Sequence, residues 1–160
     1  MSETVNHESY DDAYLADILA ATKVIALVGA SSNVARPSYT VMGYLLAKGY
    51  VVHPVNPGLA GGSIHGQQVY ARLADVPAPV DMVDIFRNSQ AAELVTQEAI
   101  RLKDKLQIKT IWMQIGVRND GAAAQGEASG LAVVMNHCPK IEYARLSGEI
   151  AAARRAAVGP

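Results

Sequence analysis

The sequence predicts an α/β fold, a Rossmann-like three-layer sandwich with a mainly parallel sheet. Two observations support this prediction. Short apolar runs typical of buried strands alternate along the chain with longer stretches typical of helices, and this alternation indicates strand–helix–strand units with parallel strands. The first strand also ends at a glycine, Gly29, and small residues then lead into a helical pattern, as in the first turn of doubly wound folds.

The first part of the chain supplies two helices and two strands. Acidic residues in the first turn mark a helix over 11–21, and five apolar residues form a strand over 24–28. Apolar residues share one face of a helix over 38–48, and Gly49 ends this helix as a C-terminal glycine does. The second strand follows over 50–55.

The rest of the chain continues the alternation after a glycine-rich loop over 58–66. The further elements expected, in order, are a short edge strand over 67–70, a helical turn over 73–76, a strand over 80–86, a helix from Asn88 or Ser89 to about 105, a strand over 110–113, a helix over 120–129 and a strand over 131–135. Asn119 precedes the last of these helices as a typical N-cap residue, and Gly130 ends it.

Length and composition indicate one domain. A chain of 160 residues, 50% hydrophobic and 18% charged, can bury a single core of ordinary size. We expect this domain to span residues 11–150, with residues 1–10 as a flexible N-terminal tail and residues 151–160 as a C-terminal tail.

Charge and cysteine content exclude several classes of protein. The net charge is −1, so no basic field favours nucleic acid. The single cysteine, Cys138, excludes a disulfide framework, and His53, His65 and His137 are too scattered for a metal cluster. No apolar run is long enough to span a bilayer, and the acidic N-terminus is unlike a signal peptide. We therefore expect a cytoplasmic protein without nucleic-acid or membrane partners, and a homodimer is the assembly we consider.

The carboxyl ends of parallel strands meet at one edge of a sheet, where ligands of doubly wound folds bind. The segments expected at this edge are Gly29–Ser32, Asn56–Gly58, Phe86–Asn88, Gln114–Gly116 and Asn136–Cys138. A glycine turn that enters a helix leaves free backbone N–H groups, and these groups together with the helix dipole form an anion site, usually for phosphate. The sequence therefore predicts a ligand that carries phosphate.

Specific absences disfavour NAD and NADP as that ligand. Only Gly29 fits the G-x-G-x-x-G pattern, and the second strand ends with Asn56 and Pro57 instead of the acid that binds a ribose hydroxyl. NADP would need a basic residue at this place, and Gly58 follows. Flavin mononucleotide stays open in principle, although its phosphate usually needs a loop richer in hydroxyl groups.

Five motifs occur in an order and spacing that resemble a known family: VGAS at 28–31, RPSY at 36–39, PVNP at 54–57, VDMVDIFR at 80–87 and CPKIE at 138–142. Over about 22–142 the chain is similar to the small stand-alone CoA-binding proteins of bacteria and archaea. These proteins resemble the N-terminal CoA-binding domain of the succinyl-CoA synthetase α subunit. The sequence has no ligase domain or phosphohistidine segment, so the resemblance implies binding of CoA or an acyl-CoA without synthetase activity.

The resemblance also assigns roles to residues at the expected edge of the sheet. It implies that the pyrophosphate lies on the turn at Gly29 and on the amides of Ala30, Ser31, Ser32 and Asn33, with Arg36, Pro37 and Ser38 at the helix start. It implies that the adenine and ribose lie at Asn56 and Pro57, and that Phe86 and Arg87 border the adenosine or a phosphate. The pantetheine would then run along Met113, Gln114 and Gly116, with Cys138 nearby. Many relatives carry lysine after Asn-Pro. Here Gly58 stands in that place, which shifts the expected charge to Arg36 or Arg87.

No catalytic set accompanies this site in the sequence. There is no nucleophile elbow with a Ser-His-Asp set and no metal-ligand spacing, and the alternation of Asp81 and Asp84 on a strand indicates structural roles. A CoA-binding protein without catalysis is therefore the first hypothesis. Two alternatives stay open: an NAD(P)-linked oxidoreductase or acyl-CoA-using enzyme with its acid–base group in a loop, and a redox-responsive protein that pairs Cys138 with the CoA thiol.

Overall fold

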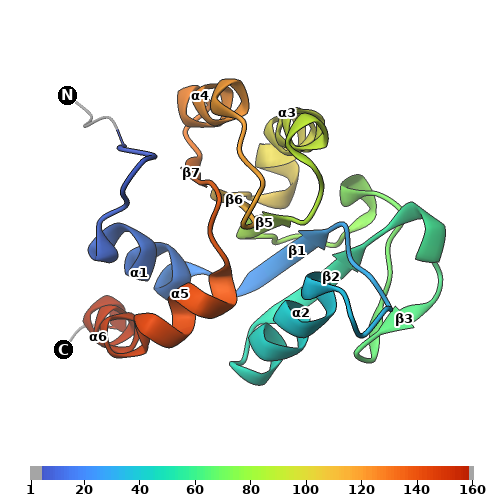
Figure 1. The fold of residues 1–160 in the computed structure, drawn as a ribbon, viewed down its shortest axis with the longest axis horizontal. Helices are drawn as coiled ribbons and strands as arrows, with labels where there is room; N and C mark the ends of the chain where they lie inside the picture. Colours follow the sequence, from blue (N-terminus) through green and yellow to red (C-terminus); the bar gives the residue numbers. More distant parts are fainter. Residues whose placement is uncertain (1–4, 159–160) are drawn as a thin grey trace.

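The sheet has the parallel, Rossmann-like arrangement that the sequence predicts. A computed structural model describes residues 5–158 of the chain. Its main sheet has the order β2-β1-β5-β6-β7, and every neighbouring pair of strands is parallel (Figure 1). The strands are β1 (Val24–Val28), β2 (Val51–Val55), β5 (Met82–Ile85), β6 (Thr110–Met113) and β7 (Ala132–Val134). The strand order reverses between β1 and β5, which is where folds of this kind bind ligands.

Helices cover both faces of the sheet (Figure 1). One face carries α1 (Asp12–Ala21), α2 (Pro37–Ala47) and α5 (Pro139–Arg145), with α6 (Ser147–Val158) beside α1, and the other face carries α3 (Ser89–Leu106) and α4 (Asp120–Ala128). Residues of β1 alternate between the two cores. Ile25 and Leu27 pack on the α1 and α2 side, whereas Ala26 and Val28 pack on the α3 and α4 side.

Helices α3 and α4 begin at the cap residues that the sequence predicts. Asn88 Oδ1 accepts a hydrogen bond from the Ala91 N–H at 2.8 Å, and Asn119 Oδ1 accepts one from the Ala122 N–H at 2.9 Å. Each side chain thereby satisfies one of the free N–H groups of a first helical turn. Helix α3 ends at Gln107, which takes the left-handed conformation with φ 61°.

The segment between β2 and β5 differs from the prediction of an edge strand over 67–70. It contains the 3-10 turns η1 (Pro57–Leu59) and η2 (Leu73–Asp75) and a separate antiparallel hairpin of β3 (Ser63–Ile64) and β4 (Gln67–Gln68). His65 and Gly66 both have positive φ, so the chain turns back on itself instead of continuing along the sheet. Only Tyr70 of the predicted strand reaches the main sheet, through a parallel bridge to Val55.

The C-terminal segment is helical where the sequence analysis expected a tail. Helix α6 includes residues 151–158, and the short helix α5 before it was also not predicted. Ile150 is fully buried in the core beside α1. The guanidinium of Arg154 donates to Leu19 O at 3.3 Å and, more weakly, to Ala20 O at 3.4 Å, at the end of α1. No helix within residues 5–158 is long and apolar enough to cross a membrane.

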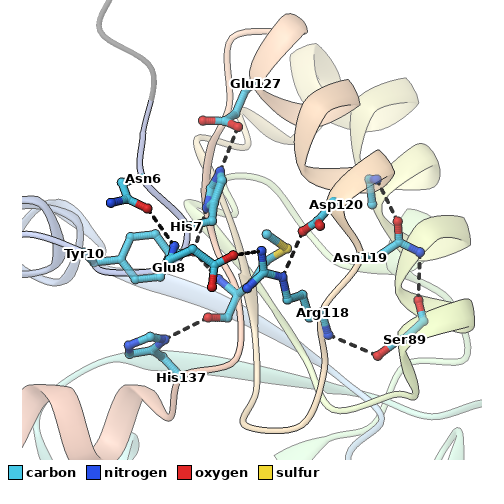
Figure 2. Close-up of polar contacts among 12 residues, drawn as sticks. Asn6, His7, Glu8, Tyr10, Ser89, Arg118, Asn119, Asp120, Glu127 and His137 are labelled. Atoms are coloured by element: carbon cyan, nitrogen blue, oxygen red, sulfur yellow. Dashed lines mark hydrogen bonds and ion pairs between the residues drawn. The ribbon is translucent and has the colours of Figure 1, made fainter.

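The N-terminal residues before α1 also pack on the domain, although residues 1–10 were predicted to form a flexible tail. Figure 2 shows two of their contacts. His7 Nε2 lies 2.9 Å from Glu127 Oε1 of α4, and the Glu8 carboxylate accepts a hydrogen bond from Arg118 Nη2 at 2.6 Å. Polar contacts to α4 and to the loop before it thus place residues 5–10, whereas residues 1–4 lie outside the described part of the chain.

The outer edge of β7 is closed by tyrosine hydroxyl groups. The Tyr14 hydroxyl donates to Val133 O at 2.9 Å and accepts from the Val133 N–H at 3.2 Å. The Tyr10 hydroxyl accepts from the Met135 N–H at 2.8 Å. Burial raises the pKa of Tyr14 to about 12, so this hydroxyl keeps the proton that it donates. The backbone groups of Val133 are therefore satisfied without a neighbouring strand.

Candidate functional site

The turn after β1 brings the carboxyl ends of β1 and β5 close together. Gly29 has φ +93°, and a Cβ at this position would lie 2.5 Å from Phe86 O and 3.2 Å from Arg87 Cδ. A side chain would strain the backbone and also collide with the end of β5, so both the turn and the close approach require glycine. Phe86 and Arg87 consequently lie directly beside the turn.

The loop between β1 and α2 uses part of its backbone for its own hydrogen bonds. The Ala30 N–H donates to Val55 O at 3.2 Å, and the Asn33 N–H donates to Ser31 Oγ at 3.0 Å. The structure therefore differs from the prediction that Ala30 and Asn33 offer their amides to a pyrophosphate, because both donors are already used. Within residues 5–158 the amides of Ser31 and Ser32 have no protein partner.

A cleft with two lobes lies at this edge of the sheet. Lobe A has a volume of about 510 Å³ and lobe B a volume of about 680 Å³, and both are lined by Gly29, Asn56 and Arg87. The other residues of lobe A are Val28, Val55, Pro57, Gly58, Ala71, Arg72, Leu73, Val95 and Glu98. The other residues of lobe B are Ala30, Ser31, Arg36, Pro37, Ser38, Phe86, Gln114, Ile115 and Val117.

Most of the predicted site residues line this cleft. They are Gly29, Ala30, Ser31, Arg36, Pro37, Ser38, Asn56, Pro57, Phe86, Arg87 and Gln114. Ser32 and Asn33 belong to the same loop but do not line either lobe. Gly116 stands outside the cleft as well, and its N–H donates to Asn136 Oδ1 at 2.7 Å.

Two predicted residues lie in the core instead of the cleft. Met113 is completely buried on the α3 and α4 side of the sheet, because the alternation of β6 turns its side chain to that face. Cys138 is 5% exposed and packs in the core on the opposite face, at the N-cap position of α5. The structure therefore places neither residue along a path for pantetheine.

The sequence analysis missed several residues that line the cleft, and two of them are charged. Arg72 lies in the loop before η2, and Glu98 lies on α3. Neither position carries a local signal, since a polar residue in a loop or on a helix is ordinarily solvated. Ile115 lies in a segment predicted at this edge, and it is 55% exposed in lobe B.

The charges of the cleft favour an anionic ligand. Arg36 lines lobe B, Arg72 lines lobe A and Arg87 lines both. Among the described residues, neither Arg36 nor Arg87 forms an ion pair with a carboxylate. Among residues 5–158, Glu98 is the one acid that lines either lobe. Guanidinium groups with free N–H donors are well suited to phosphate oxygens.

Asn56, predicted at the adenine and ribose end, supports the cleft through its side chain. Its Nδ2 donates to Ala30 O at 2.8 Å, and its Oδ1 accepts from the Gly58 N–H at 2.8 Å. The side chain thus joins the loop after β1 to the loop after β2. Each end of the amide has a protein partner, and the neutral amide lacks the carboxylate charge of the acid that binds a ribose hydroxyl in NAD sites.

The carboxyl and metal-ligand side chains of the described residues do not gather in the cleft. Asp84 of β5 is fully buried, and within residues 5–158 neither of its oxygens has a hydrogen-bond partner. Burial raises the pKa of the Asp84 carboxyl well above its usual value, but this residue lines neither lobe. In the described part of the chain, no group of three His, Cys, Asp or Glu side chains could hold a metal ion.

Comparison with known proteins decides the family. The family model of the CoA binding domain matches residues 23–144 of this chain. The chain belongs to this family. The CoA-binding domain found here is 30% identical over 132 residues to the uncharacterized protein YneT of Bacillus subtilis, a match that covers 82% of this chain and 93% of YneT.

Solved structures agree with this assignment. A hypothetical protein from Pyrococcus horikoshii OT3 superposes on this CoA-binding domain with a TM-score of 0.81 and 34% identity, over 92% of this chain and 100% of that one. A protein from Thermus thermophilus superposes with a TM-score of 0.76 and 32% identity, over 85% and 98% of the two chains. Both the family resemblance and the Rossmann-like fold predicted from the sequence are confirmed.

Proposed function

We propose that this protein binds coenzyme A or an acyl-CoA in the two-lobed cleft, as a binding protein without its own catalytic set. The observation that carries the proposal is that three arginines line a cleft at the point where the strand order reverses. The family supports CoA as the ligand class. CoA carries its diphosphate between the adenosine and the pantetheine arm. This arrangement fits two lobes that share the charged residue Arg87.

The diphosphate is assigned to the shared part of the cleft. Ser31 offers a backbone N–H group from the lobe B side, at the loop that leads into α2. Arg36 and Arg87 offer guanidinium groups from two sides. Backbone donors before a helix N-terminus together with arginine form a strong site for phosphate oxygens.

Lobe A is assigned to the adenosine. Val55, Leu73 and Val95 give it an apolar surface on which a purine ring can lie. Glu98 offers a carboxylate that can accept hydrogen bonds from an amino or hydroxyl group. A binding site with an apolar surface and a few polar groups is typical for a ligand of this kind.

Lobe B is assigned to the pantetheine arm. Phe86, Ile115 and Val117 give it apolar walls. Gln114 Oε1 is buried, and no hydrogen-bond donor among the described residues reaches it. A buried acceptor without a partner is costly unless a ligand or water supplies a donor, and the pantetheine arm carries amide N–H groups. The residues present therefore fit the group that the family implies.

Isothermal titration calorimetry with CoA, acetyl-CoA, NAD, NADP and FMN tests the proposal. We expect CoA and acetyl-CoA to bind at least about tenfold more tightly than NAD or FMN, because the end of β2 lacks the ribose-binding acid. The melting temperature should rise in the same order, since a ligand that binds only the native state stabilises it. Equal or tighter binding of NAD would overturn the proposal.

A further inference from the structure

The three arginines of the cleft do not lie together. Arg36 lines lobe B only, Arg87 lines both lobes, and Arg72 lines lobe A only. A single diphosphate at the loop before α2 accounts for Arg36 and Arg87. It leaves Arg72 on the far side of the shared centre, in the lobe assigned to the nucleoside. A further cation in that lobe calls for a second, separate anionic group on the ligand.

The Arg72 guanidinium is held only weakly by the protein. Its Nη2 lies 3.3 Å from Asp75 Oδ1, and the two side chains are 71% and 40% exposed. Exposed ion pairs of this kind contribute little to stability, so exchanging the carboxylate for a phosphate carries a small penalty. The backbone of Arg72 is better fixed, because the Asp75 N–H donates to Arg72 O at 3.0 Å and closes the turn η2.

Glu98 limits where that second anion can lie. It lines lobe A from helix α3, together with Val95 of the same helix. A carboxylate repels phosphate, so the phosphate is expected on the Arg72 side of the lobe, with hydrogen-bond donors of the base or ribose toward Glu98. The lobe therefore has an acceptor on one side and a cation on another, as a phosphorylated nucleoside requires.

We infer that Arg72 binds a phosphate monoester on the ribose of the ligand and makes lobe A selective for a 3′-phosphorylated nucleotide over its dephosphorylated form. The inference rests on the proposed function, because it assumes that the adenosine of CoA lies in lobe A. The sequence around Arg72 gave no sign of this role, and Gly58 leaves the end of β2 without a charge of its own. The 2′-phosphate of NADP offers similar chemistry, so the test includes it.

The test is calorimetry of the full chain and of Arg72→Gln with CoA, with dephospho-CoA and with NADP. We expect the unchanged protein to prefer CoA by about tenfold or more, the usual effect of a charged hydrogen-bond pair. Arg72→Gln should lose that preference, with CoA weakened about tenfold and dephospho-CoA changed by less than about twofold. Arg155→Gln is the matched control, since it removes the same charge from α6, outside both lobes.

The outcomes separate the inference from the function on which it rests. An unchanged ratio of CoA to dephospho-CoA affinity in Arg72→Gln, in a protein that still binds CoA, overturns the role of Arg72 alone. An equal loss in Arg155→Gln overturns it too, because the effect would then come from net charge. NADP binding tighter than CoA overturns the assignment to a 3′-phosphate. Failure of the unchanged protein to bind either form of CoA overturns the proposed function itself.

Discussion

Arginines in two regions, at the contacts of the N-terminal segment and in the two-lobed cleft, differ in their partners. Arg118, in the loop before α4, contacts Glu8 at 2.6 Å and Asp120 at 2.9 Å. Figure 2 shows both contacts. Arg145 contacts Asp12 at 2.8 Å. These arginines join parts of the chain that are more than a hundred residues apart in sequence.

The arginines of the cleft have no such partners. Among residues 5–158, Arg36 and Arg87 form no ion pair, and Arg72 has one long contact to a neighbour in the same turn. Arginines that join distant parts of the chain have short carboxylate contacts, whereas those beside the cleft have a long contact or none among the described residues. Under the proposed function, this difference distinguishes structural arginines from binding ones.

The largest expected effect comes from filling the turn on which the cleft is built. Gly29→Ala should lower the free energy of unfolding by about 3 kcal/mol, because it combines positive φ with a contact of 2.5 Å to Phe86 O. Gly49→Ala is the control, since Gly49 has φ +95° but open space around it, and it should cost only about 1 kcal/mol. Urea denaturation measures both, and equal losses would show that the close approach has no effect.

A second experiment tests the comparison directly with one arginine from each region. Arg36→Gln should weaken CoA binding by about 1.5–3 kcal/mol and leave the melting temperature nearly unchanged, because its guanidinium has no ion-pair partner among the described residues. Arg118→Gln should leave CoA affinity unchanged and lower the melting temperature, since it loses its contacts to Glu8 and Asp120. Calorimetry and thermal melts should therefore give opposite patterns, and similar patterns for both variants would abolish the distinction.

A third prediction extends the comparison to carboxylates. Asp84 is buried without a partner, and burial raises its pKa well above 3.8. The unfolded chain ionises Asp84 above about pH 4 while the folded chain keeps the proton, so this group lowers stability as pH rises through that range. Asp84→Asn should therefore be more stable than the unchanged protein at pH 7, by about 1 kcal/mol or more, and the difference should vanish near pH 3.

Melts of both proteins from pH 3 to pH 8 measure this difference. Asp81→Ala serves as the control, because Asp81 Oδ2 accepts hydrogen bonds from the N–H groups of Lys23 and Val24, each at 2.9 Å, and alanine offers no acceptor. This variant should be less stable than the unchanged protein. A lower stability of Asp84→Asn at pH 7 would mean that the Asp84 carboxyl has a stabilising partner in solution.

The smallest expected effect concerns the redox alternative. Cys138 is buried and lies outside both lobes, so its thiol is shielded from a disulfide in solution. We expect no CoA adduct by intact mass spectrometry when the folded protein is incubated with CoA disulfide, and an adduct once urea unfolds it. Cys138→Ser should give no adduct in either state. A rapid adduct on the folded protein would restore the redox hypothesis.

Periodicity and cap residues were sufficient to predict the sheet and most helices, but they failed at the C-terminal end of the chain. Helix α6 is rich in alanine, and only Ile150 of its residues is buried. Such a segment has no apolar face for a sequence pattern to detect. Its position depends on Arg154 and the carbonyls of a helix far away in sequence, which only the folded chain brings together.

The candidate site shows the same limit. The ends of β1, β2 and β5 were predictable because strand order and turn residues mark them in the sequence. Met113 and Cys138 were misplaced because a residue near a strand end can face either core or cleft. Arg72 and Glu98 could not be predicted, since nothing near them in sequence indicates that a loop and a helix would meet at one lobe.

The hydroxyl groups that close β7 have a consequence for how copies of this protein can associate. An open edge strand is a template on which a second sheet can grow, in a dimer or in a fibril. Tyr14 occupies both outward groups of Val133, and Tyr10 occupies the N–H of Met135. A continuous sheet across two copies would have to break these bonds at β7 before it made any of its own. Tyr10 and Tyr14 therefore block the addition of a further strand at the β7 edge. A homodimer that keeps these hydrogen bonds has to form through another surface.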